Sequence, residues 1–120
     1  MDINVETVEK GKLLFGAKYK GSFHKDFSIG LLTVREGFEA QKEVAAVYGN
    51  DTRYSLLGLI AKRLKTLGTI PKKEITVDLL LDMKDLDLDI IIKKYQALDG
   101  RLETFRESFE TPDGNGSGSS

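Results

Sequence analysis

The spacing of apolar residues changes at about residue 33, and this change constrains the fold more than any other feature. From Tyr19 to Leu31 the apolar side chains fall on odd positions, between glycines that suggest turns. Alternation with a period of two is typical of a half-buried strand, whereas the period of three to four after Thr33 is typical of amphipathic helices. The sequence therefore predicts an α+β fold: an N-terminal β-hairpin or small antiparallel meander packed on a bundle of three to four helices.

Capping residues predict where the first helix begins and ends. Thr33 and Glu36 have the spacing of a capping box, in which each side chain binds a backbone N–H near the other. This predicts a helix over residues 34–48 that stops at Gly49. The apolar residues that share one face of this helix are Phe38, Ala45 and Tyr48.

Further helices are predicted after this one. Asp51 or Thr52 can cap a helix whose apolar stripe continues to Leu67, with Gly68 as the residue after its end. Pro71 then redirects the chain. The remaining predicted helices cover residues 77–83, capped by Thr76, and residues 87–109.

The length and the end of the sequence predict one domain with a tail. The chain has 120 residues, which is the usual size of a single domain. We expect residues 1–109 to form one α+β domain. Residues 110–120 are rich in glycine and serine and have little to bury, so they are predicted to be a disordered tail, either native or a cloning scar.

Composition argues against several classes of function. The chain has 18 basic and 19 acidic residues, a balance that does not favour nucleic acid as a partner. It has no cysteine and one histidine, which argues against disulfides and thiolate or histidine-rich metal sites. The apolar runs are short and the N-terminus lacks a signal-peptide pattern, so we expect a cytoplasmic protein with no membrane partner. No catalytic motif is recognised, and we expect neither enzyme activity nor a cofactor.

An aspartate triplet is the strongest hint of metal chemistry. Asp85, Asp87 and Asp89 match the first three ligand positions of a calcium loop. The sixth position needs glycine and is Ile90, and the twelfth needs glutamate and is Gln96. Acidic residues are also favoured at a helix N-terminus by the helix dipole. Capping of the last helix is therefore the preferred interpretation.

Two further polar features have simple structural interpretations. His24 has no second histidine or nucleophile to work with and is interpreted as a solvated strand residue. The one concentrated basic cluster is interpreted as a solvated helix end, with contact to an acidic protein surface or to nucleic acid as alternatives. Its members are Lys62, Arg63, Lys65, Lys72 and Lys73.

The apolar residues of the last two predicted helices exceed what one small hairpin needs. Three adjacent leucines cover most of the circumference of a short helix, so some must meet other protein or a partner. The alternative is that these faces pack against each other and the second helix; a homo-oligomer interface is also left open. The candidate protein-binding residues are Leu79, Leu80, Leu81, Ile91, Tyr95, Leu98, Leu102 and Phe105.

Three stretches together resemble a known family. They contain DFSIGLLTVRE at residues 26–36, GTIP at 68–71 after a helix, and ITVDLL at 75–80 leading through DLDLD into the last helix. Over residues 12–106 this layout resembles the tail assembly chaperones of tailed bacteriophages, of the small Mu-like type. The chain departs from the family at Gly37, where an acidic run is usual, and in its alanine-rich first helix.

The resemblance implies a non-enzymatic protein of the host cytoplasm. Such chaperones coat the tape-measure protein and help tail tube subunits to polymerise around it, and some have a longer, frameshifted form. The implied partners are therefore tape-measure and tail tube proteins, bound through apolar helical segments. Two alternatives remain: a structural subunit of a contractile tail or baseplate, and a small nucleic-acid-binding regulator.

Overall fold

The structure is a computed structural model that describes residues 7–110, without the side chains of residues 105 and 107–110. Its elements in chain order are β1 (Glu9–Tyr19), β2 (Ser22–Ile29), α1 (Val34–Tyr48), α2 (Thr52–Arg63), β3 (Leu64–Leu67), the 3-10 turn η1 (Lys72–Glu74), α3 (Val77–Leu81) and α4 (Asp85–Glu110). This confirms the predicted α+β class and the N-terminal hairpin packed on helices. Of the predicted tail, Glu110 ends α4 and residues 111–120 lie outside the described residues.

The sheet has three antiparallel strands in the order β1-β2-β3. Its third strand is a correction, because the sequence predicted helix as far as Leu67. Leu67 pairs with Phe27 and Leu64 with Ile29, so four apolar side chains with at most 3% exposure line the inner face. Backbone bonds bracket this pairing, from Gly30 N–H to the Arg63 carbonyl at 2.8 Å and from Gly68 N–H to the Asp26 carbonyl at 2.7 Å.

The early end of α2 has a physical reason outside its own sequence. Leu64 and Leu67 are three residues apart, which suits one face of a helix as well as a buried strand. A helix over these residues would leave the N–H and C=O groups along one edge of β2 without these partners. Pairing with β2 decides the conformation, and α2 ends at Arg63.

The other helix ends follow their capping residues closely. Thr33 and Glu36 form the predicted capping box, and α1 spans the predicted residues. Asp51 accepts a hydrogen bond from Arg53 N–H and caps α2. Thr76 caps α3, which is two residues shorter than predicted. Short-range capping residues therefore predict the helix ends, whereas the pairing of β3 with β2 could not be predicted from the sequence.

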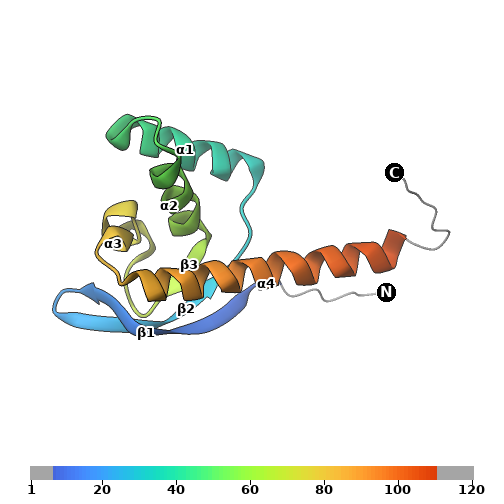
Figure 1. Ribbon diagram of the computed structural model, residues 1–120, viewed down its shortest axis with the longest axis horizontal. Coiled ribbons are helices and arrows are strands. Elements are labelled where there is room, and N and C mark those ends of the chain that lie inside the picture. Colours follow the sequence, from blue (N-terminus) through green and yellow to red (C-terminus); the bar gives the residue numbers. More distant parts are fainter. Residues whose placement is uncertain (1–6, 111–120) are drawn as a thin grey trace.

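The helices lie on one side of the sheet (Figure 1). Helix α4 lies along the strands and extends beyond them, and its main strand contact is β1. Helix α2 stands on the inner face, and α1 packs on α2 as an outer layer. The core residues with no exposed surface include Ile29, Ile60, Leu64, Leu67, Ile91 and Leu98.

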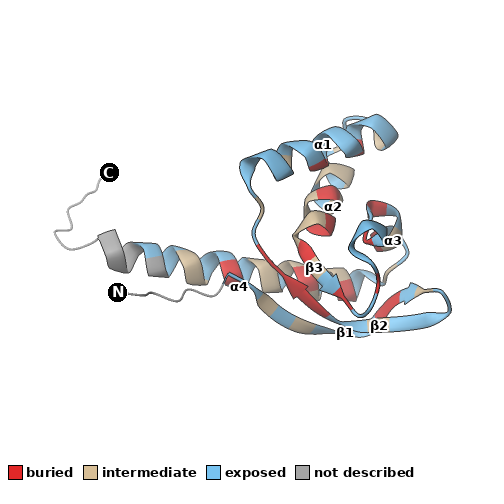
Figure 2. Cartoon of the chain, turned by 180° about the vertical axis from the view of Figure 1, so that it is seen from behind, coloured by how far each residue is buried: buried red, intermediate tan, exposed pale blue. Residues whose placement is uncertain are grey.

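Helix α1 is the least covered of the long elements (Figure 2). It buries Ala40 and Val44, and Gly58 of α2 allows the close approach, because a Cβ there would lie 2.4 Å from Val44. The ring of Tyr48 stacks on Tyr54 with 4.5 Å between the ring centres. Phe38, in contrast, is 69% exposed. The prediction that Phe38 and Tyr48 share a packed face is therefore wrong: Tyr48 contacts α2, whereas Phe38 is mostly exposed.

Candidate functional site

Several candidate protein-binding residues belong to the core. Leu80 of α3 is 3% exposed, and Ile91 and Leu98 of α4 have no exposed surface. This corrects their assignment to an interaction surface: α4 packs mainly on β1, and α3 packs on α2 and β1. The reason is that β3 and the hairpin together present a wider apolar face than a hairpin alone.

The other candidates lie nearer the surface. Leu81 is 44% exposed, while Leu79, Tyr95 and Leu102 are half-buried. The guanidinium of Arg63 lies 4.6 Å from the centre of the Tyr95 ring, so this ring already has an internal partner. The side chain of Phe105 lies outside the described residues.

Sequence reasoning missed exposed apolar residues on α1, and others at Leu14, Phe23 and Leu86. Val34 and Val47 are each 73% exposed and Phe38 is 69% exposed. Val34 and Phe38 are four residues apart and share one side of the helix, while the buried Ala40 and Val44 occupy another. The sequence does carry a signal for this exposure. Apolar residues fall on two sides of α1, and a helix in an outer layer can bury only one of its sides.

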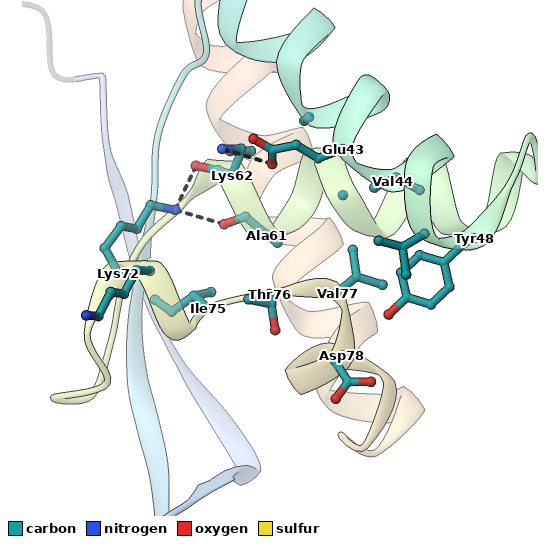
Figure 3. A pocket seen from close by; sticks show the side chains of 14 residues that line it. Glu43, Val44, Tyr48, Ala61, Lys62, Lys72, Ile75, Thr76, Val77 and Asp78 are labelled. Carbon is teal, nitrogen blue, oxygen red and sulfur yellow. Dashed lines mark hydrogen bonds and ion pairs between the residues drawn. The ribbon is translucent and has the colours of Figure 1, made fainter.

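A groove runs between α1 and α3, with α2 as its floor (Figure 3). We call it the α1–α3 groove; it has a volume of about 380 Å³. Its floor and walls are small or aliphatic, with Ala40, Val44, Ala61, Ile75 and Val77 all buried. The exposed Val47 stands among the residues that line it. A side chain entering this groove would meet mainly carbon.

Charged groups occupy the two ends of the α1–α3 groove. Lys62 and Lys72 lie toward the end where α2 finishes, and Asp78 lies at the start of α3 (Figure 3). Lys73, next to Lys72 in η1, also lines the groove. Glu43 of α1 pairs with Lys62 across the groove at 3.4 Å. The groove is therefore apolar in the middle and carries opposite charges at its ends.

Lys72 closes the C-terminus of α2. Its Nζ donates hydrogen bonds to the carbonyl oxygens of Ala61 at 2.9 Å, Lys62 at 3.2 Å and Leu64 at 2.7 Å. These carbonyls are ones that the end of a helix leaves without internal partners. Burial, followed by repulsion from Lys65 and Lys62, lowers the pKa of Lys72 to about 8. Its crowded ammonium group makes this end of the groove positive.

A second groove lies between α2 and α4. It has a volume of about 430 Å³ and opens beside Leu31 and Leu56, which are each about 40% exposed. Arg63 and Asp99 line this groove and form a bidentate ion pair at 2.8 and 3.2 Å. The Arg63 guanidinium also donates to the Gly30 carbonyl at 2.9 Å. This corrects the interpretation of Arg63 as part of a solvated helix end.

The aspartate triplet has a structural role that differs from simple helix capping. Asp87 has no exposed surface, and its carboxylate accepts hydrogen bonds from the N–H groups of Leu14, Phe15 and Gly16 at 2.7 to 3.3 Å. These amides lie where β1 loses its register with β2. Asp89 pairs with Lys93 at 3.1 Å. Within residues 7–110 no cluster of three or more acidic or histidine side chains could hold a metal ion.

His24 is also more than a solvated strand residue. It is half-buried, and its Nδ1 accepts a hydrogen bond from Thr69 N–H at 3.3 Å. Its ring lies against Gly68, where a Cβ would be only 2.2 Å from Nδ1. The histidine thus holds the turn that follows β3.

Comparisons with models of protein families, with curated proteins and with solved structures find no match to this chain. None of the helices in the described part of the chain is long and apolar enough to cross a membrane.

Proposed function

We propose that this chain is a non-enzymatic assembly factor that binds another protein through the exposed apolar side chains of α1 and the grooves beside it. The observation that carries the proposal is the exposure of Val34, Phe38 and Val47 on a helix that packs mainly on α2. Large apolar side chains gathered on one exposed element favour a protein partner. The two grooves next to α1 add concave apolar surface to the same region.

The finer proposal is a phage tail assembly chaperone that binds the tape-measure protein and assists polymerisation of the tail tube in the host cytoplasm. It rests on the resemblance carried by residues 26–36, 68–71 and 75–89. An exposed apolar helix suits reversible masking of apolar segments in a partner. The basic cluster does not favour a nucleic-acid regulator, because Lys62, Arg63 and Lys72 each have partners inside the molecule.

Co-expression with a tape-measure protein tests this proposal. We expect the tape-measure protein to stay soluble and to co-purify with the wild-type chain. The double variant Phe38→Asp, Val47→Asp should fold but lose the tape-measure protein, because both positions are exposed and the new charges would be buried on binding. The double variant Lys10→Glu, Lys25→Glu alters exposed residues of the sheet that line neither groove and is the control. Failure of the wild-type chain to co-purify would count against the proposal.

Mass spectrometry of finished particles separates a chaperone from a structural subunit of the tail or baseplate. A chaperone should be absent from purified tails. Recovery of this chain in a fixed ratio to the tube protein would favour the structural alternative.

A further inference from the structure

We infer that the α1–α3 groove binds one amphipathic helix of a partner protein, with carboxylates near the C-terminus of that helix set against Lys72 and Lys73. The inference rests on the proposed function only for the identity of the partner. The site and the chemistry of its occupant follow from the groove itself.

The middle of the groove determines what face the occupant presents. Its floor contains Gly58 and Ala61, and Ala40 and Val44 form one wall. Val44 already fills the space at Gly58, so the small side chains of Ala40 and Ala61 and the aliphatic ones of Ile75 and Val77 supply the contact. A volume of about 380 Å³ accommodates a few apolar side chains of one helix face. Val47, at 73% exposure, would be covered by such an occupant.

The ends of the groove determine the direction of the occupant. At one end are Lys73 and Lys72; Lys72 already donates to three carbonyl oxygens and adds positive charge, and Lys62 is paired to Glu43. At the other end is the Asp78 carboxylate (Figure 3). A helix has a partial negative charge at its C-terminus and a partial positive charge at its N-terminus. Both ends therefore favour an occupant whose C-terminus lies at the lysines, parallel to α2.

Charge complementarity also selects the side chains of the occupant. Within residues 7–110, no hydrogen bond or ion pair occupies the side chain of Lys73. Glutamate or aspartate in the last turn of the partner helix would supply its counter-charge. Basic side chains there would face two lysines and be repelled.

Designed peptides test both the site and the direction. One peptide of about four helical turns carries leucines at positions i, i+3, i+4 and i+7 with glutamates in its last turn. A second has the same composition with the glutamates in its first turn, and a third has lysines in place of the glutamates. Each is titrated into the isotope-labelled full chain, and amide NMR shifts report binding and its location.

We expect the first peptide to bind most tightly and to shift amides of α1, α2 and α3 around the groove. Lys73→Glu should weaken binding by about two- to fivefold, the scale of an exposed ion pair. Val47→Asp should weaken it by at least about tenfold, because the new charge would be buried. Lys10→Glu, on the sheet and outside the groove, should leave binding unchanged.

Three results would overturn the inference: no shifts at the groove, equal binding of all three peptides, or binding unaffected by Val47→Asp and Lys73→Glu. The proposed function fails separately. If the peptides bind as expected while a tape-measure protein does not co-purify, the groove stands and the chaperone role falls. If the tape-measure protein co-purifies equally with wild type and with both groove variants, the chaperone role stands and the groove is not its binding site.

Discussion

Asp87 supplies the hydrogen-bond partners that β1 loses where its register breaks. The strand pairs with β2 up to Lys12 and again from Ala17. Between them, three successive N–H groups point at one buried carboxylate. A buried N–H without a partner is costly, so this one side chain allows β1 to bulge against α4.

Replacing Asp87 with asparagine should lower the free energy of unfolding by at least about 2 kcal/mol, because an amide loses the charge and turns an NH₂ group toward an N–H donor. Urea denaturation measures the change. Asp85→Asn is the matched control, because Asp85 is exposed in the same helical turn and should change stability by less than about 0.5 kcal/mol. Equal effects of the two changes would contradict this role of Asp87.

We expect the free energy of unfolding to depend on pH through Lys72. Its pKa is lowered from 10.5 to about 8 in the folded chain, chiefly by burial. Between pH 8 and pH 10.5 the unfolded chain binds more protons at Lys72 than the folded chain does, so the free energy of unfolding rises with pH. The contribution of Lys72 to stability is complete above pH 10.5 and is lost as pH falls through about 8.

The free energy of unfolding of wild type, minus that of Lys72→Met, should therefore increase from about pH 7 to pH 10. Denaturation of both proteins in the same buffers measures it. A difference that decreases over this range would mean that the three carbonyls raise the pKa of Lys72 more than burial lowers it.

We expect substitutions at Gly68 and His24 to have coupled effects on the free energy of unfolding. Gly68 has a φ of +56°, and a Cβ there would collide with the His24 ring. Gly68→Ala should therefore cost more than the roughly 1–2 kcal/mol of the left-handed conformation alone. In the double variant His24→Ala, Gly68→Ala the collision is removed. A double-mutant cycle measures the coupling, and strictly additive effects would contradict the contact.

At the scale of the elements, helix limits set by local chemistry could be predicted and those set by distant pairing could not. The capping box of Thr33 and Glu36 acts within one turn and gave α1 correctly. Leu64 and Leu67 suit either conformation, and β2, more than 30 residues earlier, decides between them. The α1–α3 groove joins three elements whose relative positions depend on that sheet, so its lining could not be predicted from periodicity.

The junction of α2 and β3 depends on Arg63. Its side chain is 14% exposed and joins Gly30, Asp99 and the Tyr95 ring. Arg63→Met should lower the free energy of unfolding by about 1–3 kcal/mol, because the Gly30 carbonyl and Asp99 lose a charged partner. Arg53→Met is the control: its ion pair with Asp51 is exposed, so the loss should stay below about 1 kcal/mol. Thermal denaturation compares them, and similar losses would contradict the importance of the junction.

At the scale of the molecule, the exposed apolar residues of α1 lie apart from the main core, although β1, β2 and α4 also expose Leu14, Phe23 and Leu86. The sheet, α2, α3 and the first half of α4 contain most of the buried residues, while α1 lies outside them, burying Ala40 and Val44 and exposing Val34, Phe38 and Val47. Substitutions at the exposed residues Val34, Phe38 and Val47 of α1 should therefore affect partner binding without unfolding the chain. This separation is what the proposed chaperone role requires.

The most direct test of the account is calorimetric titration of a soluble tape-measure segment into the purified full chain and its Phe38→Asp, Val47→Asp variant. We predict saturable binding to the wild type and at least about tenfold weaker binding to the variant, with the two proteins unfolding at similar urea concentrations. Equal binding to both proteins, or none to the wild type, would contradict the claim that the exposed apolar residues of α1 recognise the tape-measure protein.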